Sequence, residues 1–224
     1  MEAHAHARVH LHERRASVAT RTILQVGALA GIAGGLMYAA WQMLVAAIAQ
    51  DPTAVPAIHQ TLWTPPAGIW SVVFGVHHFH GSFHFIPVFG GIVAHVGNAL
   101  LFGILGLALL TAILGRRPNV AAAVVLGAAY GIAVDAILLL GIINTQKIQT
   151  LYSASPHWSW WVGHGIFGVT LGLLGSVLLR RNNAKQAEVP LAASSRLRRR
   201  SPRNADTRDE FWNLGNQLTR DRES

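Results

Sequence analysis

Three ionisable side chains lie within long apolar stretches of the chain: His95, Asp135 and His164. An acid close to imidazoles can hold or pass on a proton, and the same groups can bind a small polar ligand or a metal ion. An Asp in an apolar environment is costly unless it is paired or protonated, so Asp135 requires a partner. The two histidines are the candidates.

A second group of candidate ligands is a segment in which four histidines, His77, His78, His80 and His84, fall within eight residues. His77 with His80, and His80 with His84, have the spacing that brings two imidazoles together on a structured turn. Zn and Cu both accept imidazole nitrogen, so this segment is a candidate metal site. A metal-dependent enzyme is disfavoured, because catalysis would be expected to add a carboxylate base and Asp51 is the only acid in the connecting loops.

Four long apolar runs carry or adjoin these residues. They span roughly residues 22–49, 85–114, 120–143 and 158–179, and Asp135 is their only Asp, Glu, Lys or Arg. Each exceeds the ~20 residues that cross a bilayer as a helix. Only 12% of the chain is charged, against about 25% in soluble domains. The sequence therefore predicts an all-α polytopic membrane protein, a bundle of four transmembrane helices over residues 22–181.

Basic residues indicate the orientation of these helices. Of 18 Lys and Arg residues, 17 lie before the first run, between the second and third, or after the fourth; the other loops contain only Lys147. The positive-inside rule places the side rich in Lys and Arg in the cytoplasm. We therefore expect both termini to be cytoplasmic and residues 50–84 to form an outer loop.

Counting residues from the arginines that flank the helices gives the depth of each ionisable group. His95, Asp135 and His164 lie 21, 18 and 16 residues from these arginines, which corresponds to about 31, 27 and 24 Å at the helical rise. Gln42, 21 residues beyond Arg21, reaches the same level from the first helix. The four side chains are therefore expected near the outer side of the bilayer.

Small residues indicate which way these side chains point. Each ionisable residue belongs to a series of Gly or Ala at a spacing of three or four, for example Gly127, Gly131 and Asp135. Small residues at this spacing let transmembrane helices approach closely. We therefore expect His95, Asp135 and His164 to face one another inside the bundle.

The two ends of the chain are polar. Residues 1–21 contain four histidines and four arginines, and residues 182–224 are rich in Asn, Ser, Ala and Arg; both segments are expected to be disordered. A basic tail next to a membrane is attracted to anionic lipid by about 1 kcal/mol per Lys or Arg near the surface. Nucleic acid is not an expected partner, because the charge lies at the ends of the chain rather than over a folded polar surface.

Short motifs within residues 22–180 carry a family resemblance: Gly27 to Gly35 followed by Trp41, Trp63-Thr64-Pro65, His95 with Leu101-Phe102-Gly103, Gly127-x-x-Tyr130-Gly131 and His164-x-x-Phe167-Gly168. The chain resembles a group of uncharacterised bacterial four-helix membrane proteins, and in plan it is similar to the DUF1440 inner-membrane family. The resemblance implies a multi-pass protein of the bacterial inner membrane and a link to acid resistance. It does not extend to the histidine-rich segment or the basic tail.

Three hypotheses for function are open at this point. In the first, His95, Asp135, His164 and Gln42 form a cluster near the outer face that responds to pH or to a small ligand. In the second, the chain is a structural subunit of a homo-oligomer or of a larger membrane complex, and its glycine faces meet a foreign helix. In the third, the histidine-rich segment binds Zn or Cu. A b-type haem between His95 and His164 is disfavoured, because that pocket would rest on two ligands near the interface.

Overall fold

The structure is a computed structural model that describes the backbone of residues 2–49, 60–75, 82–141, 151–152 and 154–200. Side chains are described for residues 20–49, 60–75, 82–138, 151–152 and 154–185. The chain divides into two compact units, Met1–Asn182 and Asn183–Ser224. The cavity and the side chains discussed below belong to the first unit.

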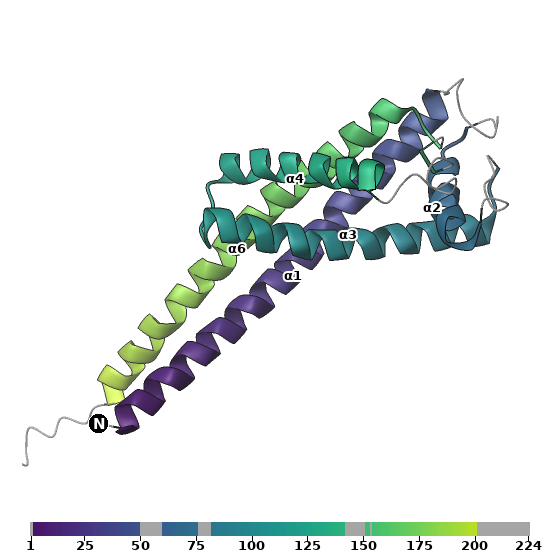
Figure 1. Ribbon diagram of the computed structural model, residues 1–224. Coiled ribbons are helices and arrows are strands. Elements are labelled where there is room, and N and C mark those ends of the chain that lie inside the picture. The colour runs from purple at the N-terminus through teal and green to yellow at the C-terminus, as the bar shows by residue number, and fades with distance from the viewer. Residues whose placement is uncertain (1, 50–59, 76–81, 142–150, 153, 201–224) are drawn as a thin grey trace, which may run out of the picture. The chain divides into compact units, whose positions relative to one another are not determined.

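The described residues form five helices: α1 (Glu2–Ile48), α2 (Thr64–Phe74), α3 (Phe85–Leu114), α4 (Val120–Gly141) and α6 (His157–Arg200) (Figure 1). Four contain a segment long and apolar enough to cross a membrane, namely Thr20–Ile48, Phe85–Leu114, Val120–Leu138 and His157–Lys185. These segments overlap the four predicted runs, and the predicted all-α four-span fold is confirmed. The chain is therefore a multi-pass integral membrane protein, whereas the cytoplasmic placement of its termini stays a prediction.

Two helices extend beyond the predicted spans. α1 begins at Glu2 and α6 continues to Arg200. Composition alone predicts disorder in residues 1–21 and from residue 182 onward, whereas the backbone of residues 2–21 and 182–200 is helical. The physical reason is that Ala and Arg, which are common in both segments, are strong helix formers.

The predicted outer loop contains a helix, α2, that its sequence pattern does not indicate. Pro65-Pro66 suggests a turn, yet these prolines occupy the first turn of α2, where a missing N–H breaks no helical hydrogen bond. The helix ends at Gly75, whose φ of 111° suits glycine. α2 packs on α3, since Gly91 leaves room for the Pro66 carbonyl group.

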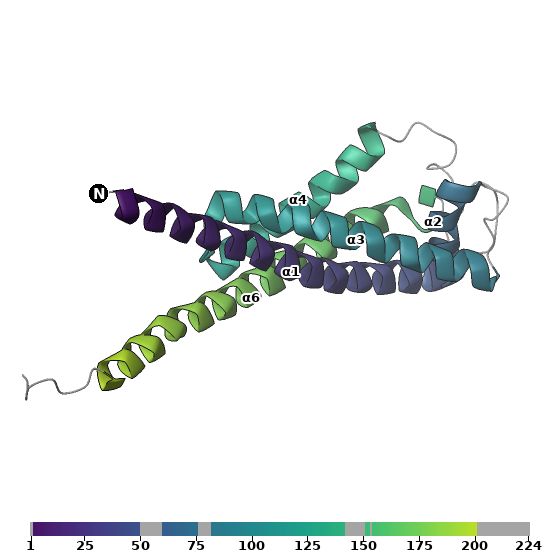
Figure 2. The ribbon, with the colours of Figure 1, turned by 90° about the horizontal axis from the view of Figure 1, so that it is seen from below.

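Small residues make the close contacts between spans. Gly31 of α1 lies against Ala99 and Gly103 of α3, where a Cβ added to the glycine would overlap the opposing backbone. Gly127 of α4 and Gly168 of α6 form an equivalent contact. α3 crosses α1 in both views (Figure 1 and Figure 2). The glycine faces identified in the sequence therefore pack within this chain, in two helix pairs.

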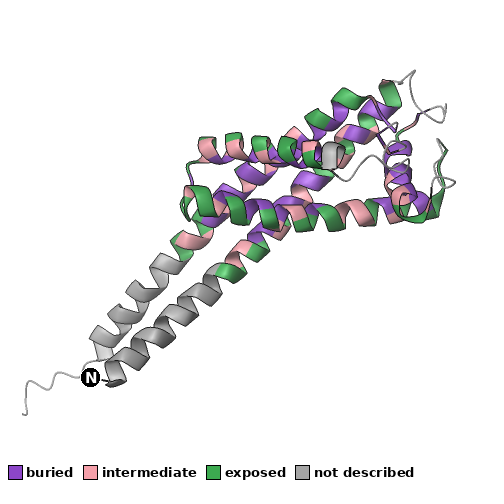
Figure 3. Ribbon diagram, viewed as in Figure 1, coloured by how far each residue is buried: buried purple, intermediate pink, exposed green. Residues whose placement is uncertain are grey.

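The spans carry many exposed positions (green in Figure 3), and large apolar residues occupy many of them. Leu29, Ile113, Val125 and Ile137 each expose between 59% and 67% of their surface. An apolar surface of this extent is unfavourable in water and suits lipid chains, while the helices satisfy their own backbone hydrogen bonds. These faces contact the bilayer.

Candidate functional site

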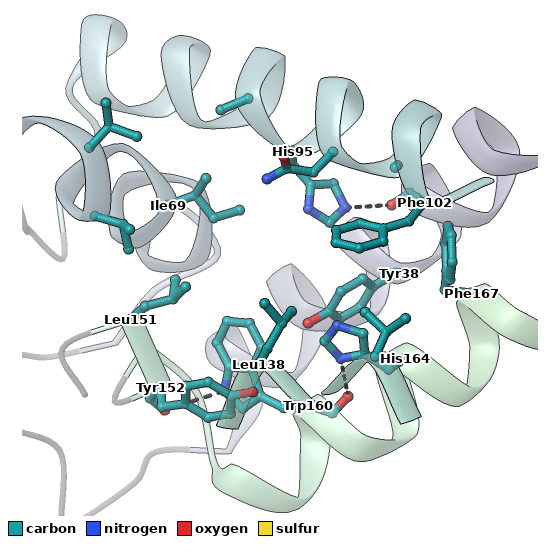
Figure 4. A pocket seen from close by; sticks show the side chains of 17 residues that line it. Tyr38, Ile69, His95, Phe102, Leu138, Leu151, Tyr152, Trp160, His164 and Phe167 are labelled. Atoms are coloured by element: carbon teal, nitrogen blue, oxygen red, sulfur yellow. Dashed lines mark hydrogen bonds between the residues drawn. The ribbon is translucent and has the colours of Figure 1, made fainter. Parts of the chain in front are cut away.

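A cavity of about 230 Å³ lies between α1, α2, α3, α4 and α6 (Figure 4). Its walls are mostly apolar and include Ile69 of α2, Phe102 of α3 and Leu138 of α4. The polar residues in its lining are Tyr38, His95, Asn98, Tyr152, Trp160 and His164. The cavity is smaller than the roughly 300–1,000 Å³ of pockets that bind drug-sized ligands, so it suits a small molecule.

Asp135 and His164 meet where α4 packs on α6. Asp135 is completely buried and His164 is 8% exposed. The Nδ1 atom of His164 lies 3.1 Å from Oδ1 of Asp135, and the Tyr152 hydroxyl donates a hydrogen bond of 2.5 Å to the same oxygen. Gly131 allows this approach, because a Cβ there would overlap the His164 carbonyl oxygen. The partner that Asp135 requires is thus His164, with Tyr152 as a second donor.

His95 lies on the other side of the Tyr38 ring from His164 (Figure 4). The Tyr38 ring centre is 5.2 Å from that of His95 and 4.6 Å from that of His164. His95 Nε2 donates to the Gly35 carbonyl oxygen at 2.9 Å. Of the three ionisable side chains that were expected to face one another, Asp135 and His164 are in contact, whereas the Tyr38 ring separates His95 from this pair.

Gln42 is buried, and it contacts the start of α6 and the segment that leads into it. Its Oε1 accepts hydrogen bonds from Ser155 Oγ at 2.5 Å and from Ser159 Oγ at 3.1 Å. Its Nε2 and the Tyr38 hydroxyl are both buried with no hydrogen-bond partner among the described residues. Asp135 Oδ2 is likewise buried with no partner among the described side chains. Buried polar atoms of this kind normally bind water or a ligand.

Three aromatic residues that complete the site were not among the predicted site residues. Tyr38 precedes Gln42 by one helical turn, so its spacing would have placed it on the same face. Tyr152 comes from the connection between the third and fourth spans, and no spacing rule links such a residue to Asp135. Trp160 Nε1 donates to the Tyr152 carbonyl oxygen at 3.3 Å, which helps hold Tyr152 in place.

The environment of Tyr152 favours the neutral phenol. Burial raises the pKa of its hydroxyl, and the hydrogen bond to Asp135 raises that pKa further. An ionised Tyr152 would lose this hydrogen bond and face a carboxyl oxygen. Tyr152 therefore acts as a hydrogen-bond donor at neutral pH.

The histidine-rich segment is described only at its end. His77, His78 and His80 lie outside the described residues, and His84 is exposed with its Nε2 3.0 Å from Ser82 Oγ. Among the residues that the structure describes, no three His, Cys, Asp or Glu side chains are grouped to hold a metal ion. Binding of Zn or Cu by the complete segment stays a prediction.

Fold and site define a class: an all-helical, multi-pass integral membrane protein with a small internal cavity beside a buried acid–imidazole pair. No family model, curated protein or solved structure matches the chain. The four-span plan is the part of the family resemblance that the structure supports, and no particular family is identified.

Proposed function

We propose that this membrane protein binds a small, largely apolar molecule in the cavity, and that His164 is the polar residue that contacts this molecule. Asp135, which also accepts a hydrogen bond from Tyr152, holds His164 in place. One observation carries this proposal: His164 lines the cavity while its Nδ1 is held from behind, 3.1 Å from both Asp135 Oδ1 and the Trp160 carbonyl oxygen. A few fixed polar groups in a mostly apolar cavity are typical of ligand sites.

The surroundings of His164 support a preorganised contact. Its ring packs against the Tyr38 ring, and the Asp135 oxygen that it contacts also accepts from Tyr152. A side chain held in this way loses little conformational entropy when a ligand binds. If His164 served only to support the helix bundle, no cavity beside this residue would be required.

The packing of the glycine faces gives less support to the accessory-subunit hypothesis. That hypothesis expects some of these faces to meet a foreign helix. Gly31 packs on α3, and Gly127 packs on α6 within the chain. These two faces are thus occupied, and the outward surface is made of large apolar side chains suited to lipid.

A cavity-filling variant tests the proposal. Ala94 lines the cavity from α3, whereas Leu105 of the same helix is 52% exposed on the lipid face. Purified wild type, Ala94→Phe and the control Leu105→Phe would be reconstituted in nanodiscs and screened by thermal shift against small amphipathic molecules. A ligand that binds the folded state raises the melting temperature.

We expect at least one compound to stabilise the wild type and Leu105→Phe but not Ala94→Phe. If no compound stabilises the wild type, or if Ala94→Phe is stabilised equally, the cavity is not a binding site.

A further inference from the structure

Building on the proposed function, we infer that the ligand is an aromatic molecule that carries a hydroxyl group, the chemistry shared by simple phenols and by quinol headgroups. Two hydrogen bonds that fix the protons of His95 and His164 lead to this assignment. They determine which nitrogen of each imidazole can accept a hydrogen bond.

Backbone carbonyl oxygens set the tautomer of each ring. A carbonyl oxygen only accepts hydrogen bonds, so the nitrogen that contacts it must carry the hydrogen. His95 Nε2 contacts the Gly35 oxygen at 2.9 Å, and His164 Nδ1 contacts the Trp160 oxygen at 3.1 Å. Each neutral imidazole has one N–H. The lone pairs therefore lie on Nδ1 of His95 and Nε2 of His164.

These two nitrogens are acceptors on residues that line the cavity. Both histidines line it, and no hydrogen bond to either nitrogen occurs among the described residues. Figure 4 shows the two rings on either side of Tyr38, with the second nitrogen of His164 directed away from its carbonyl partner. A ligand at these nitrogens must supply a donor, which a hydroxyl group can do and an ether or a quinone carbonyl cannot.

Two donors in the same wall are in use, whereas the Tyr38 hydroxyl has no hydrogen-bond partner among the described residues. The Tyr152 hydroxyl donates to Asp135, and Trp160 Nε1 donates to the Tyr152 carbonyl oxygen. A ligand hydroxyl could donate to an imidazole and accept from Tyr38, whereas a ligand that can only accept would leave the two imidazole nitrogens unsatisfied. A ligand that leaves buried polar groups of the site unpaired loses more affinity than a ligand that merely lacks a contact.

The shape of the lining favours a ring. Tyr38, Phe102, Trp160 and Phe167 all contribute aromatic surface to the cavity. Aromatic side chains pack favourably with another ring in stacked or edge-to-face geometry. A volume of about 230 Å³ leaves room for a small ring system. An aromatic hydroxyl compound satisfies the walls and the two acceptors together.

Matched ligand pairs test the inference on the intact protein. The wild type in nanodiscs would be titrated by calorimetry with 4-propylphenol and with 4-propylanisole, which has the same ring but no donor; empty nanodiscs correct for partition into lipid. A second arm would compare a short-chain quinol, kept reduced under anaerobic conditions, with its quinone. The same titrations on His164→Phe remove one acceptor, and Leu105→Phe is the control on the lipid face.

We expect the phenol to bind about ten-fold more tightly than the ether, because the ether leaves the acceptors unpaired. His164→Phe should lose most of this preference, and Leu105→Phe should keep it. If the quinol also binds, the ligand would come from the membrane as a quinol headgroup. If only the phenol binds, the ligand would be a free simple phenol.

Equal affinity for phenol and ether would overturn the hydroxyl assignment and leave the proposed cavity function standing. If neither compound binds, the hydroxyl assignment is overturned. The thermal-shift screen then tests separately whether the cavity binds any ligand. Because the ligand pairs are compared on the wild type, the outcome does not depend on the folding of His164→Phe.

Discussion

His164 Nδ1 lies 3.1 Å from Asp135 Oδ1 across the contact between α4 and α6. This contact pairs the two polar groups with each other, which lowers the free-energy cost of burying them in a membrane. Tyr152 donates to the same carboxyl oxygen. One carboxyl group thus joins two spans to the connection between them.

Replacing Asp135 by Ala should lower the free energy of unfolding by about 1–3 kcal/mol, because His164 and Tyr152 each lose a buried acceptor. The measurement is reversible unfolding in mixed micelles, with Ile137→Ala, which is 63% exposed on the same helix, as the control. A double-mutant cycle with Tyr152→Phe should give a coupling of about 0.5–3 kcal/mol. Additive effects of the two changes would show that the hydrogen bond contributes nothing.

Gly131→Val should destabilise the fold by about 1–3 kcal/mol, because the added side chain would overlap the His164 carbonyl group where α4 meets α6. Gly165→Val is the matched control, since a Cβ at Gly165 meets nothing within 4 Å. Thermal unfolding of both variants in the same detergent compares them directly. Similar losses of stability would mean that the close helix contact is not required.

Alkaline pH should remove the stabilisation that Tyr152 provides. The pKa of its hydroxyl is raised in the folded protein, first by burial and then by Asp135. The stabilisation is therefore fully present below the pKa of an unfolded tyrosine, about 10, and is lost as the pH rises above it toward the folded pKa. The stability difference between wild type and Tyr152→Phe should be constant below about pH 10 and shrink above it. A constant difference at alkaline pH would contradict this.

The predicted orientation can be tested with single cysteines, because the chain has none of its own. Ser82, which precedes α3, and Asn119, which precedes α4, are both exposed. In intact bacterial cells a membrane-impermeant thiol reagent should label Ser82→Cys at once and Asn119→Cys only after permeabilisation. The reverse pattern would invert the topology and place the cavity end on the cytoplasmic side.

The spans and their contacts were predictable because lipid imposes simple rules on sequence. Length and lack of charge located the four helices, and the glycine spacing identified the faces on which Gly31 and Gly127 pack. Depth counting placed Asp135 and His164 at similar levels, and they are in contact. Each of these inferences needs only the residues of a single helix and the fixed rise per residue of an α-helix.

The rest of the site depends on contacts between residues that no local rule connects. Tyr152 reaches Asp135 from a connecting segment, and Tyr38 separates the two histidines because of how α1 packs on α3 and α6. Prolines at the start of α2 gave a turn signal although they begin a helix. The cavity arises from the packing of five helices, so it has no signature in any single segment.

Photolabelling tests the central claim, binding in the cavity, most directly. An aromatic hydroxyl compound bearing a diazirine would be activated in nanodiscs with and without excess 4-propylphenol, and labelled residues identified by mass spectrometry. The account predicts labelling of cavity residues such as Phe102 and Leu138 that the competitor suppresses. Labelling confined to lipid-facing residues such as Leu105 and Ile113, and unaffected by the competitor, would contradict it.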